Sequence, residues 1–229
     1  MTVYRLPGRI EAFLFDIDGT LYSNDAYGRF QSEVVIRELA KERGESYGTT
    51  LAAIDRVRAE YAAANGGAAT SLGNAMAALG VDMATSVAWR SRLIDPSEYL
   101  APDSRLRAAL GSLAAKAAAT AGGSGGRSAA LVAVTNNPRS VGLATLKALG
   151  VEDLFLRVVG LDDTMLSKPA REPYLLAARI AGAEPAACVS VGDRYDVDLS
   201  VPLELGMGAV LVAGAEDVYA LSGVLFPVI

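Results

Sequence analysis

The chain has 229 residues, of which 52% are hydrophobic, and its 21 basic and 26 acidic side chains leave a formal net charge of −5. This composition indicates a globular protein with a sizeable core, and the absence of a basic run disfavours a nucleic-acid polymer as a partner. Histidine does not occur, which excludes serine-histidine hydrolase triads, histidine-ligated zinc and histidine phosphotransfer.

The hydropathy of the sequence does not indicate a membrane-spanning segment. No apolar run approaches the roughly 18 residues of a membrane span, and residues 1–10 resemble neither a signal peptide nor an Arg-rich leader. We therefore expect a cytoplasmic protein with no membrane partner. The single cysteine, Cys188, lies in an apolar strand pattern and cannot form an internal disulfide, so we expect a buried thiol.

The first strand is expected over Ala12–Phe15, a run of four apolar residues typical of a strand that is covered on both faces. The run leads directly into Asp16 and Asp18, which are separated by one residue and followed by a glycine. Open α/β sheets bind ligands at the carboxyl ends of their strands, so both acids are candidate catalytic residues. An ordinary Asp-Gly turn would explain the same residues, and the later segments must decide.

The residues after Tyr22 show no convincing strand. Helices are expected over about 26–43, from about 51 until Gly66-Gly67, over about 71–79 and over about 82–92, and each ends near a glycine or before a proline. An all-helical block of about 75 residues is too long for an ordinary crossover between strands. We therefore expect an inserted helical cap subdomain over residues 23–100 and a main domain formed by residues 1–22 and 101–229.

The main domain resumes with a helix expected over Pro102–Ala121. The glycine-rich segment that follows, Gly122–Gly126, lacks the lysine and the hydroxyl residue of a P-loop, so it is interpreted as a surface loop. A second strand is expected over Ala129–Val134. The pattern therefore returns to alternating helices and strands.

Polar residues follow the second strand directly. Asn137 is expected as the N-cap and Pro138 as the first residue of the next helix, which ends at Gly150. A hydroxyl, an amide and backbone N–H groups at a helix start form a good anion site. Thr135 and Asn136 are therefore candidate anion ligands.

Three further strands are expected, around residues 156–160, 187–191 and 209–212. Lys168-Pro169 follows the first of them, ahead of a helix that starts near Pro173, and Gly192-Asp193 follows the second. Asp196 and Asp198 continue this last acidic segment. Any one of these motifs is weak alone, but four of them occupy strand ends or helix starts in a consistent order.

With these motifs in place, the sequence resembles the haloacid dehalogenase superfamily of phosphohydrolases. The resemblance rests on Asp16-Ile17-Asp18-Gly19-Thr20-Leu21, Thr135-Asn136, Lys168-Pro169, and Gly192-Asp193 with Asp198. It implies an α/β fold with a doubly wound, Rossmann-like sheet of five parallel strands, the first lying between the second and fourth. It also implies that the motifs meet in one crevice and that the helical insert is a cap. Within the superfamily, the sequence looks most like the pyrimidine 5′-nucleotidase-like branch. This finer likeness rests on Tyr22, the segments Thr135–Arg139 and Val151–Phe155, and the short cap.

Hydrolysis of a phosphate ester needs in-line attack, charge neutralisation and protonation of a poor leaving group. Asp16 is the proposed nucleophile, which forms an aspartyl-phosphate, and Asp18 is the proposed acid and base. Adjacent carboxylates require a cation, and we expect Mg²⁺ on Asp16, the Asp18 carbonyl and Asp193. The remaining roles are phosphoryl binding by Thr135 and Asn136, charge stabilisation by Lys168, and orientation of these groups by Asp198 in preference to Asp196.

We therefore predict an Mg²⁺-dependent phosphatase for a small phosphate monoester, for example a nucleotide or a sugar phosphate. A phosphomutase stays open, because it shares the aspartyl-phosphate and differs by excluding water. A response-regulator receiver is disfavoured because that fold has no room for a long helical insert. Receivers also carry an acidic pair early in the chain and the phosphorylated acid later, which is not the order of the acids in this sequence. Dehalogenation on the same fold is disfavoured because that branch of the superfamily lacks the second acid of the first motif, which Asp18 supplies here. Phosphonate cleavage through a cap lysine is disfavoured because Lys41 is the only lysine of the expected cap. A non-catalytic binding protein is disfavoured because every catalytic position is filled.

Overall fold

The computed structural model describes residues 1–67, 69–120 and 128–227. The chain divides into two compact units, a sheet unit of Met1–Asn24 with Pro96–Ile229 and a helical unit of Asp25–Asp95. The boundaries expected from the sequence, after residues 22 and 100, differ from these by two and five residues. The expected Gly122–Gly126 loop lies outside the described residues. No helix among the described residues is both long enough and apolar enough to cross a membrane.

The sheet unit is organised on six strands in the order β1-β6-β5-β2-β3-β4. The strands are β1 (Thr2–Arg5), β2 (Ala12–Phe15), β3 (Ala130–Val134), β4 (Arg157–Val159), β5 (Cys188–Gly192) and β6 (Gly208–Leu211). Strands β2 to β6 are parallel and β2 lies between β3 and β5, which confirms the doubly wound α/β fold. Strand β1 adds an antiparallel edge to the predicted five strands. Its residues are all exposed, so no apolar run marks it in the sequence.

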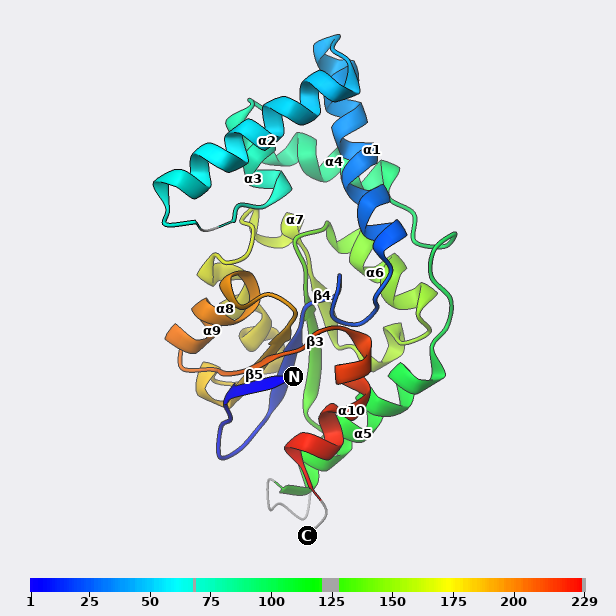
Figure 1. The fold of residues 1–229 in the computed structure, drawn as a ribbon. Helices are drawn as coiled ribbons and strands as arrows, with labels where there is room; N and C mark the ends of the chain where they lie inside the picture. The colour runs from blue at the N-terminus through cyan, green and yellow to red at the C-terminus, as the bar shows by residue number, and fades with distance from the viewer. Residues whose placement is uncertain (68, 121–127, 228–229) are drawn as a thin grey trace. The chain divides into compact units, whose positions relative to one another are not determined.

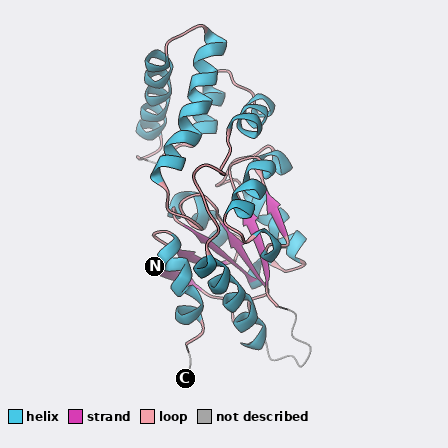
Figure 2. Cartoon of the chain, turned by 90° about the vertical axis from the view of Figure 1, so that its right-hand side faces the viewer, coloured by secondary structure: helices cyan, strands magenta, loops and turns pink. Residues whose placement is uncertain are grey.

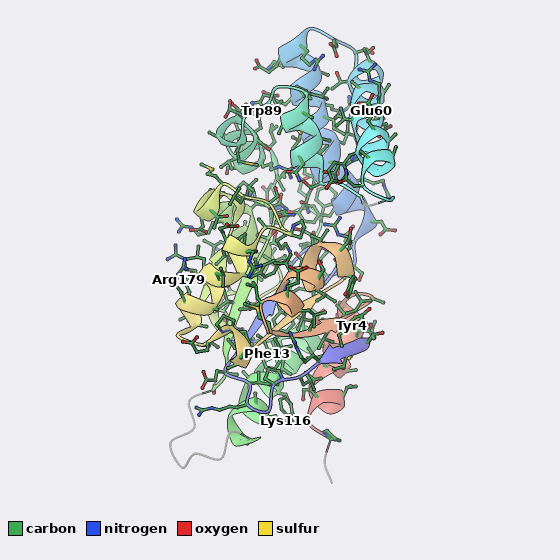
Figure 3. All side chains as sticks on the ribbon, turned by 90° about the vertical axis from the view of Figure 1, so that its left-hand side faces the viewer. Tyr4, Phe13, Glu60, Trp89, Lys116 and Arg179 are labelled. Atoms are coloured by element: carbon green, nitrogen blue, oxygen red, sulfur yellow. The ribbon has the colours of Figure 1, made fainter. Side chains whose placement is uncertain are left out.

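Helices cover both faces of this sheet (Figure 1). Helices α8 (Arg171–Ala181) and α9 (Ser200–Glu204) lie on one face, where Leu14 and Tyr174 belong to the core. Helices α5 (Ser104–Thr120), α6 (Arg139–Ala148) and α10 (Ala215–Leu225) lie on the other face. Figure 2 shows the strands side by side, with helices lying across them. Phe13 lies inside the unit in Figure 3, whereas Tyr4 of β1 lies at its surface.

Short helical segments occupy several connections of the sheet unit. They are η1 (Glu152–Leu154), α7 (Leu161–Thr164), η2 (Pro185–Ala187) and the π-helical η3 (Tyr195–Leu199). In the last of these regions the chain forms η3 followed directly by α9 (Ser200–Glu204). Helix α10 is a further addition to the predicted elements.

The helical unit contains α1 (Asp25–Arg43), α2 (Tyr47–Ala64), α3 (Leu72–Ala78) and α4 (Met83–Leu93). The side chains of Ser46, Ser71 and Asp82 cap the last three of these helices by accepting hydrogen bonds from backbone N–H groups. The buried apolar side chains of the unit include Tyr27, Val35, Ile36, Leu39, Ile54 and Met76. The described residues of this unit contain no strand, in agreement with the helical pattern of the sequence.

Candidate active site

The predicted motifs converge at the carboxyl ends of the central strands. Asp16 follows β2, Thr135 follows β3 and Asp193 follows β5, and these strands are parallel neighbours. Lys168 lies in the connection before α8, and its Nζ donates hydrogen bonds to Asp16 Oδ1 at 2.5 Å and to Asp198 Oδ1 at 2.7 Å. Lys168 and both of its partners are buried. One buried ammonium group therefore links the first, third and fourth motifs.

The acids around this lysine form a compact cluster. Asp16, Asp193 and Asp198 each offer a carboxylate oxygen, and these oxygens lie within 4.8 Å of one another. Lys168 contributes one positive charge to this group, so the ionised cluster keeps an excess of negative charge. Oxygen donors at such close spacing suit a hard divalent cation such as Mg²⁺. The donor set thus fits a divalent metal, and it includes Asp198 beside the predicted ligands Asp16 and Asp193.

Burial controls the protonation of these groups. Burial raises the pKa of Asp16 to about 7, against the lowering effect of Lys168 and with a contribution from the charges of Asp198 and Asp18. Burial, and then the charge of Asp198, also raises the pKa of Asp193. Burial alone would lower the pKa of Lys168, but the charges of Asp16 and Asp198 outweigh it and raise that pKa. Lys168 therefore stays positively charged, and the acids need additional positive charge to ionise together.

Asp18 has its own set of hydrogen-bond donors. Tyr22 Oη donates to Asp18 Oδ1 at 2.5 Å, and Asn137 Nδ2 donates to Asp18 Oδ2 at 3.1 Å. Thr135 Oγ1 lies 3.4 Å from the same Oδ2 atom. The two oxygens of Asp18 are therefore held from the loop after β2 and from the loop after β3. Tyr22 and Asn137 are site residues for which the sequence predicts no catalytic contact.

The predicted role of Asn137 as the N-cap of α6 is wrong. The N-cap is Pro138, which has extended backbone angles and makes no side-chain capping bond, and the helix begins at Arg139. The Asn137 side chain bonds to Asp18 instead, because the fold brings this carboxylate within reach from a distant part of the sequence. A local capping rule cannot register such a tertiary partner.

Asn136 connects the second motif to the third. Its Oδ1 accepts a hydrogen bond from the Lys168 backbone N–H at 2.6 Å, and its Nδ2 donates to the Lys168 carbonyl at 3.3 Å. An amide nitrogen carries two hydrogens, and this contact uses one of them. Thr135 lies in the same loop, where its Oγ1 accepts from the Asn137 backbone N–H at 3.1 Å. Phosphate binding by Thr135 and Asn136 stays a prediction.

The two candidate acids beyond Asp193 have different environments. Asp196 is exposed, whereas Asp198 is 2% exposed and contacts Lys168. The second oxygen of Asp198 accepts a hydrogen bond from the Arg194 backbone N–H at 3.2 Å. The structure thus places Asp198, and not Asp196, against the lysine.

Two glycines of the motifs are required by close contacts with these acids. Gly19 has a φ of +83°, and a Cβ atom there would lie 2.6 Å from Asp193 Oδ2. A Cβ atom on Gly192 would lie 2.4 Å from the Cβ atom of Asp198. Each glycine therefore lets an acid approach the backbone of the neighbouring loop or strand.

A doubly wound sheet with acids and a lysine gathered at its strand ends is characteristic of α/β enzymes that bind their ligands there. Comparison with known families shows to which family within this class the chain belongs. The model of the haloacid dehalogenase-like hydrolase family matches residues 10–206, and the chain belongs to that family. This membership also argues against the receiver alternative. The assignment to the pyrimidine 5′-nucleotidase-like branch stays a prediction.

Individual relatives are more distant. The chain is 42% identical over 67 residues to pyrophosphatase PpaX of Bacillus pumilus (strain SAFR-032), covering 29% of this chain and 31% of that protein. The match thus spans about a third of the curated relative. A HAD phosphatase structure from Thermococcus onnurineus has a TM-score of 0.54 at 21% identity, covering 89% of this chain and 86% of that one. The HAD-hydrolase assigned as YfnB of Bacillus subtilis, solved with magnesium, has a TM-score of 0.57 at 16% identity, covering 94% and 99%. Both structural matches support the fold.

Proposed function

We propose that the chain is a magnesium-dependent phosphatase that hydrolyses a small phosphate monoester through an aspartyl-phosphate on Asp16. The observation that carries this proposal is the 2.5 Å contact of the buried Lys168 ammonium with Asp16, inside a cluster of closely spaced carboxylates. This arrangement offers an oxygen nucleophile together with positive charge for a phosphoryl group. Membership of the hydrolase family and the magnesium bound to YfnB support the proposal.

In the first step, an Asp16 oxygen attacks the phosphorus atom and the bond from phosphorus to the leaving oxygen breaks. Asp18 gives its proton to that leaving oxygen. Lys168 stays protonated and stabilises the charge on Asp16 and on the transferring phosphoryl group. A divalent cation, held by Asp16 and Asp193, would offset the remaining negative charge of the phosphoryl oxygens and the acids.

In the second step, water attacks the phosphorus atom of the aspartyl-phosphate and gives a proton to Asp18. The bond between phosphorus and Asp16 breaks, which restores the carboxylate and releases inorganic phosphate. Tyr22 and Asn137 hold the two oxygens of Asp18, so the same carboxyl group is in place for both steps. Inorganic pyrophosphate is a second candidate substrate, which the similarity to pyrophosphatase PpaX favours.

Metal dependence is the direct test of this proposal. Hydrolysis of a small aryl phosphate should require Mg²⁺, and excess chelator should lower the rate at least about a hundredfold because the acidic cluster cannot hold an anionic ester unaided. The rate should return when Mg²⁺ is added back. Asp193→Asn should raise the Mg²⁺ concentration needed for half-maximal rate, whereas Asp196→Asn, at an exposed position, should leave it unchanged. Undiminished turnover in chelator would contradict the proposal.

The helical unit is proposed to act as a cap that selects the leaving group. The chain leaves the sheet unit after Asn24 and returns at Pro96. Asn24 Nδ2 donates a hydrogen bond to the Tyr99 carbonyl at 2.8 Å, so the two connecting segments are joined to each other. A cap hinged on paired connections can close on a substrate and contact the part of it that the strand-end motifs do not bind.

Loss of this pairing should affect large substrates selectively. Asn24→Ala should lower kcat/KM for the best substrate of a nucleotide and sugar-phosphate screen by about tenfold, with a smaller loss for a small aryl phosphate. The reason is that contacts with the leaving group contribute to only one of the two transition states. Asn65→Ala is the matched control, because Asn65 Nδ2 also donates to a backbone carbonyl at 2.8 Å but does so inside the helical unit. Equal losses on both substrates would refute the selective role.

A further inference from the structure

The segment that carries Asp198 has an unusual backbone. It is the π-helix η3, which leads directly into α9. Pro202 lies four residues after Asp198. A proline at this position offers no N–H to the Asp198 carbonyl, and its ring crowds that carbonyl, so an α-helical hydrogen bond cannot form there. The Asp198 carbonyl therefore lacks its α-helical donor and is open to a donor from another element.

Two buried hydroxyl groups bond to the backbone of this turn. Ser190 Oγ, on β5, donates a hydrogen bond to the Asp198 carbonyl at 2.8 Å. Tyr174 Oη, on α8, donates to the Val197 carbonyl at 2.6 Å. The two side chains are 2% and 1% exposed. Burial raises the pKa of Tyr174; the charge of Lys168 lowers it, and the charges of Asp198 and Asp16 raise it further. The Tyr174 hydroxyl therefore keeps the proton that it donates.

The turn also packs closely on the sheet. Gly192 leaves no room for a side chain between β5 and Asp198, because a Cβ atom there would lie 2.7 Å from the Asp198 carboxylate carbon. A shift of the η3 backbone would consequently move the carboxylate that accepts from Lys168 at 2.7 Å. The position of this backbone depends on a strand on one side and on α8 on the other.

We propose that Ser190 and Tyr174 are positioning residues for Lys168. Their hydroxyls fix the π-helical turn, the turn fixes the Asp198 carboxylate, and this carboxylate holds the ammonium group against Asp16. Lys168 stabilises charge that develops on the transferring phosphoryl group, so a looser lysine should slow the chemical step more than it weakens substrate binding. The kinetic part of this inference rests on the proposed phosphatase function.

The first test removes one hydroxyl at a time. Ser190→Ala and Tyr174→Phe should each lower kcat on a small aryl phosphate by about fivefold to tenfold and leave KM within about twofold. Matched controls come from two hydroxyl groups of α10, which bond to α5 and to the residue just before it. Ser222 Oγ lies 2.8 Å from Ser112 Oγ, and Tyr219 Oη donates to Asp103 at 2.5 Å. Ser222→Ala and Tyr219→Phe make the same chemical changes at partly buried hydroxyl groups that do not bond to η3, so they should leave kcat unchanged.

The second test does not depend on phosphatase activity. Lys168 should resist an amine-acetylating reagent in the wild type, and peptide mass spectrometry should show faster acetylation in Ser190→Ala and Tyr174→Phe but not in the controls. The exposed residues Lys41 and Lys147 are internal references for reagent strength. If the wild type hydrolyses no phosphate ester, the proposed function fails and the acetylation result alone decides the positioning role. A protected Lys168 in both variants, with unchanged kcat wherever kcat is measurable, overturns the inference.

Discussion

Asp16→Asn is expected to lower kcat by at least about 10⁴-fold and to leave no phosphoenzyme that can be trapped. An amide has nearly the size of the carboxyl group, but it carries no negative charge and is a poor nucleophile toward phosphorus. The measurement combines steady-state hydrolysis of an aryl phosphate with acid-quench trapping after exposure to a labelled acyl phosphate. In the wild type the trapped species should form and then decay rapidly, because the proposed base Asp18 would activate water beside it.

The fold of this variant should be retained. Burial raises the pKa of Asp16 to about 7, so ionising this carboxyl is costly in the folded chain, and a neutral amide does not carry that cost. Lys168 also keeps the buried carboxylate of Asp198 as its partner, so its charge is still paired in this variant. Thermal unfolding in parallel with the kinetics separates lost chemistry from lost structure. Asp196→Asn is the matched control, since it makes the same chemical change at an exposed acid of the fourth motif. Near-normal activity of Asp16→Asn would show that the nucleophile is another group.

Much of the site follows from strand ends that the sequence reveals directly. Phe13 and Leu14 belong to an unalternating apolar run, and in the structure they are 0% and 1% exposed in a central strand. Such a run is visible because burial on both faces removes the need for polar residues. The acids that follow it mark where the strand stops. The order of the parallel strands came from the family resemblance, since periodicity alone does not state which strands are neighbours.

The contacts that position the site were not predictable in the same way. Ser190 falls inside the strand expected over residues 187–191, where a small polar residue reads as part of the core, yet its hydroxyl bonds to η3. Asn137 satisfies a local capping pattern but bonds to Asp18 across 119 sequence positions. Tyr174 lies on the buried face of α8, and the sequence pattern does not distinguish it from an ordinary core residue or indicate a partner for its hydroxyl. Each of these roles depends on a partner that only the tertiary fold supplies.

Lys168→Met is expected to have the largest effect on stability. Methionine keeps most of the apolar stem but removes the charge that lies between Asp16 and Asp198, so two buried carboxyl groups lose their common partner. Breaking a buried ion pair by removing one partner typically costs about 3–5 kcal/mol. The free energy of unfolding should fall by this order at pH 8 in excess chelator, where no metal replaces the lost charge. The kcat value should fall at least about a hundredfold, because the transferring phosphoryl group loses its fixed cation.

The pH dependence of this variant follows from the sign of the carboxyl shift. The pKa of Asp16 is about 7 even with Lys168 present, and removing the lysine takes away the largest influence that lowers it. A group whose pKa is raised in the folded state destabilises that state as the pH rises through the folded pKa. The deficit of Lys168→Met should therefore be greatest above pH 7 and shrink as the acids are protonated at lower pH, and added Mg²⁺ should partly restore stability. Urea unfolding from pH 5 to 8 measures this loss in the free energy of unfolding. Lys147→Met, at an exposed position, is the control. A deficit that grows toward pH 5, or one equal to that of Lys147→Met at pH 8, would show that Lys168 does not balance the charge of these acids.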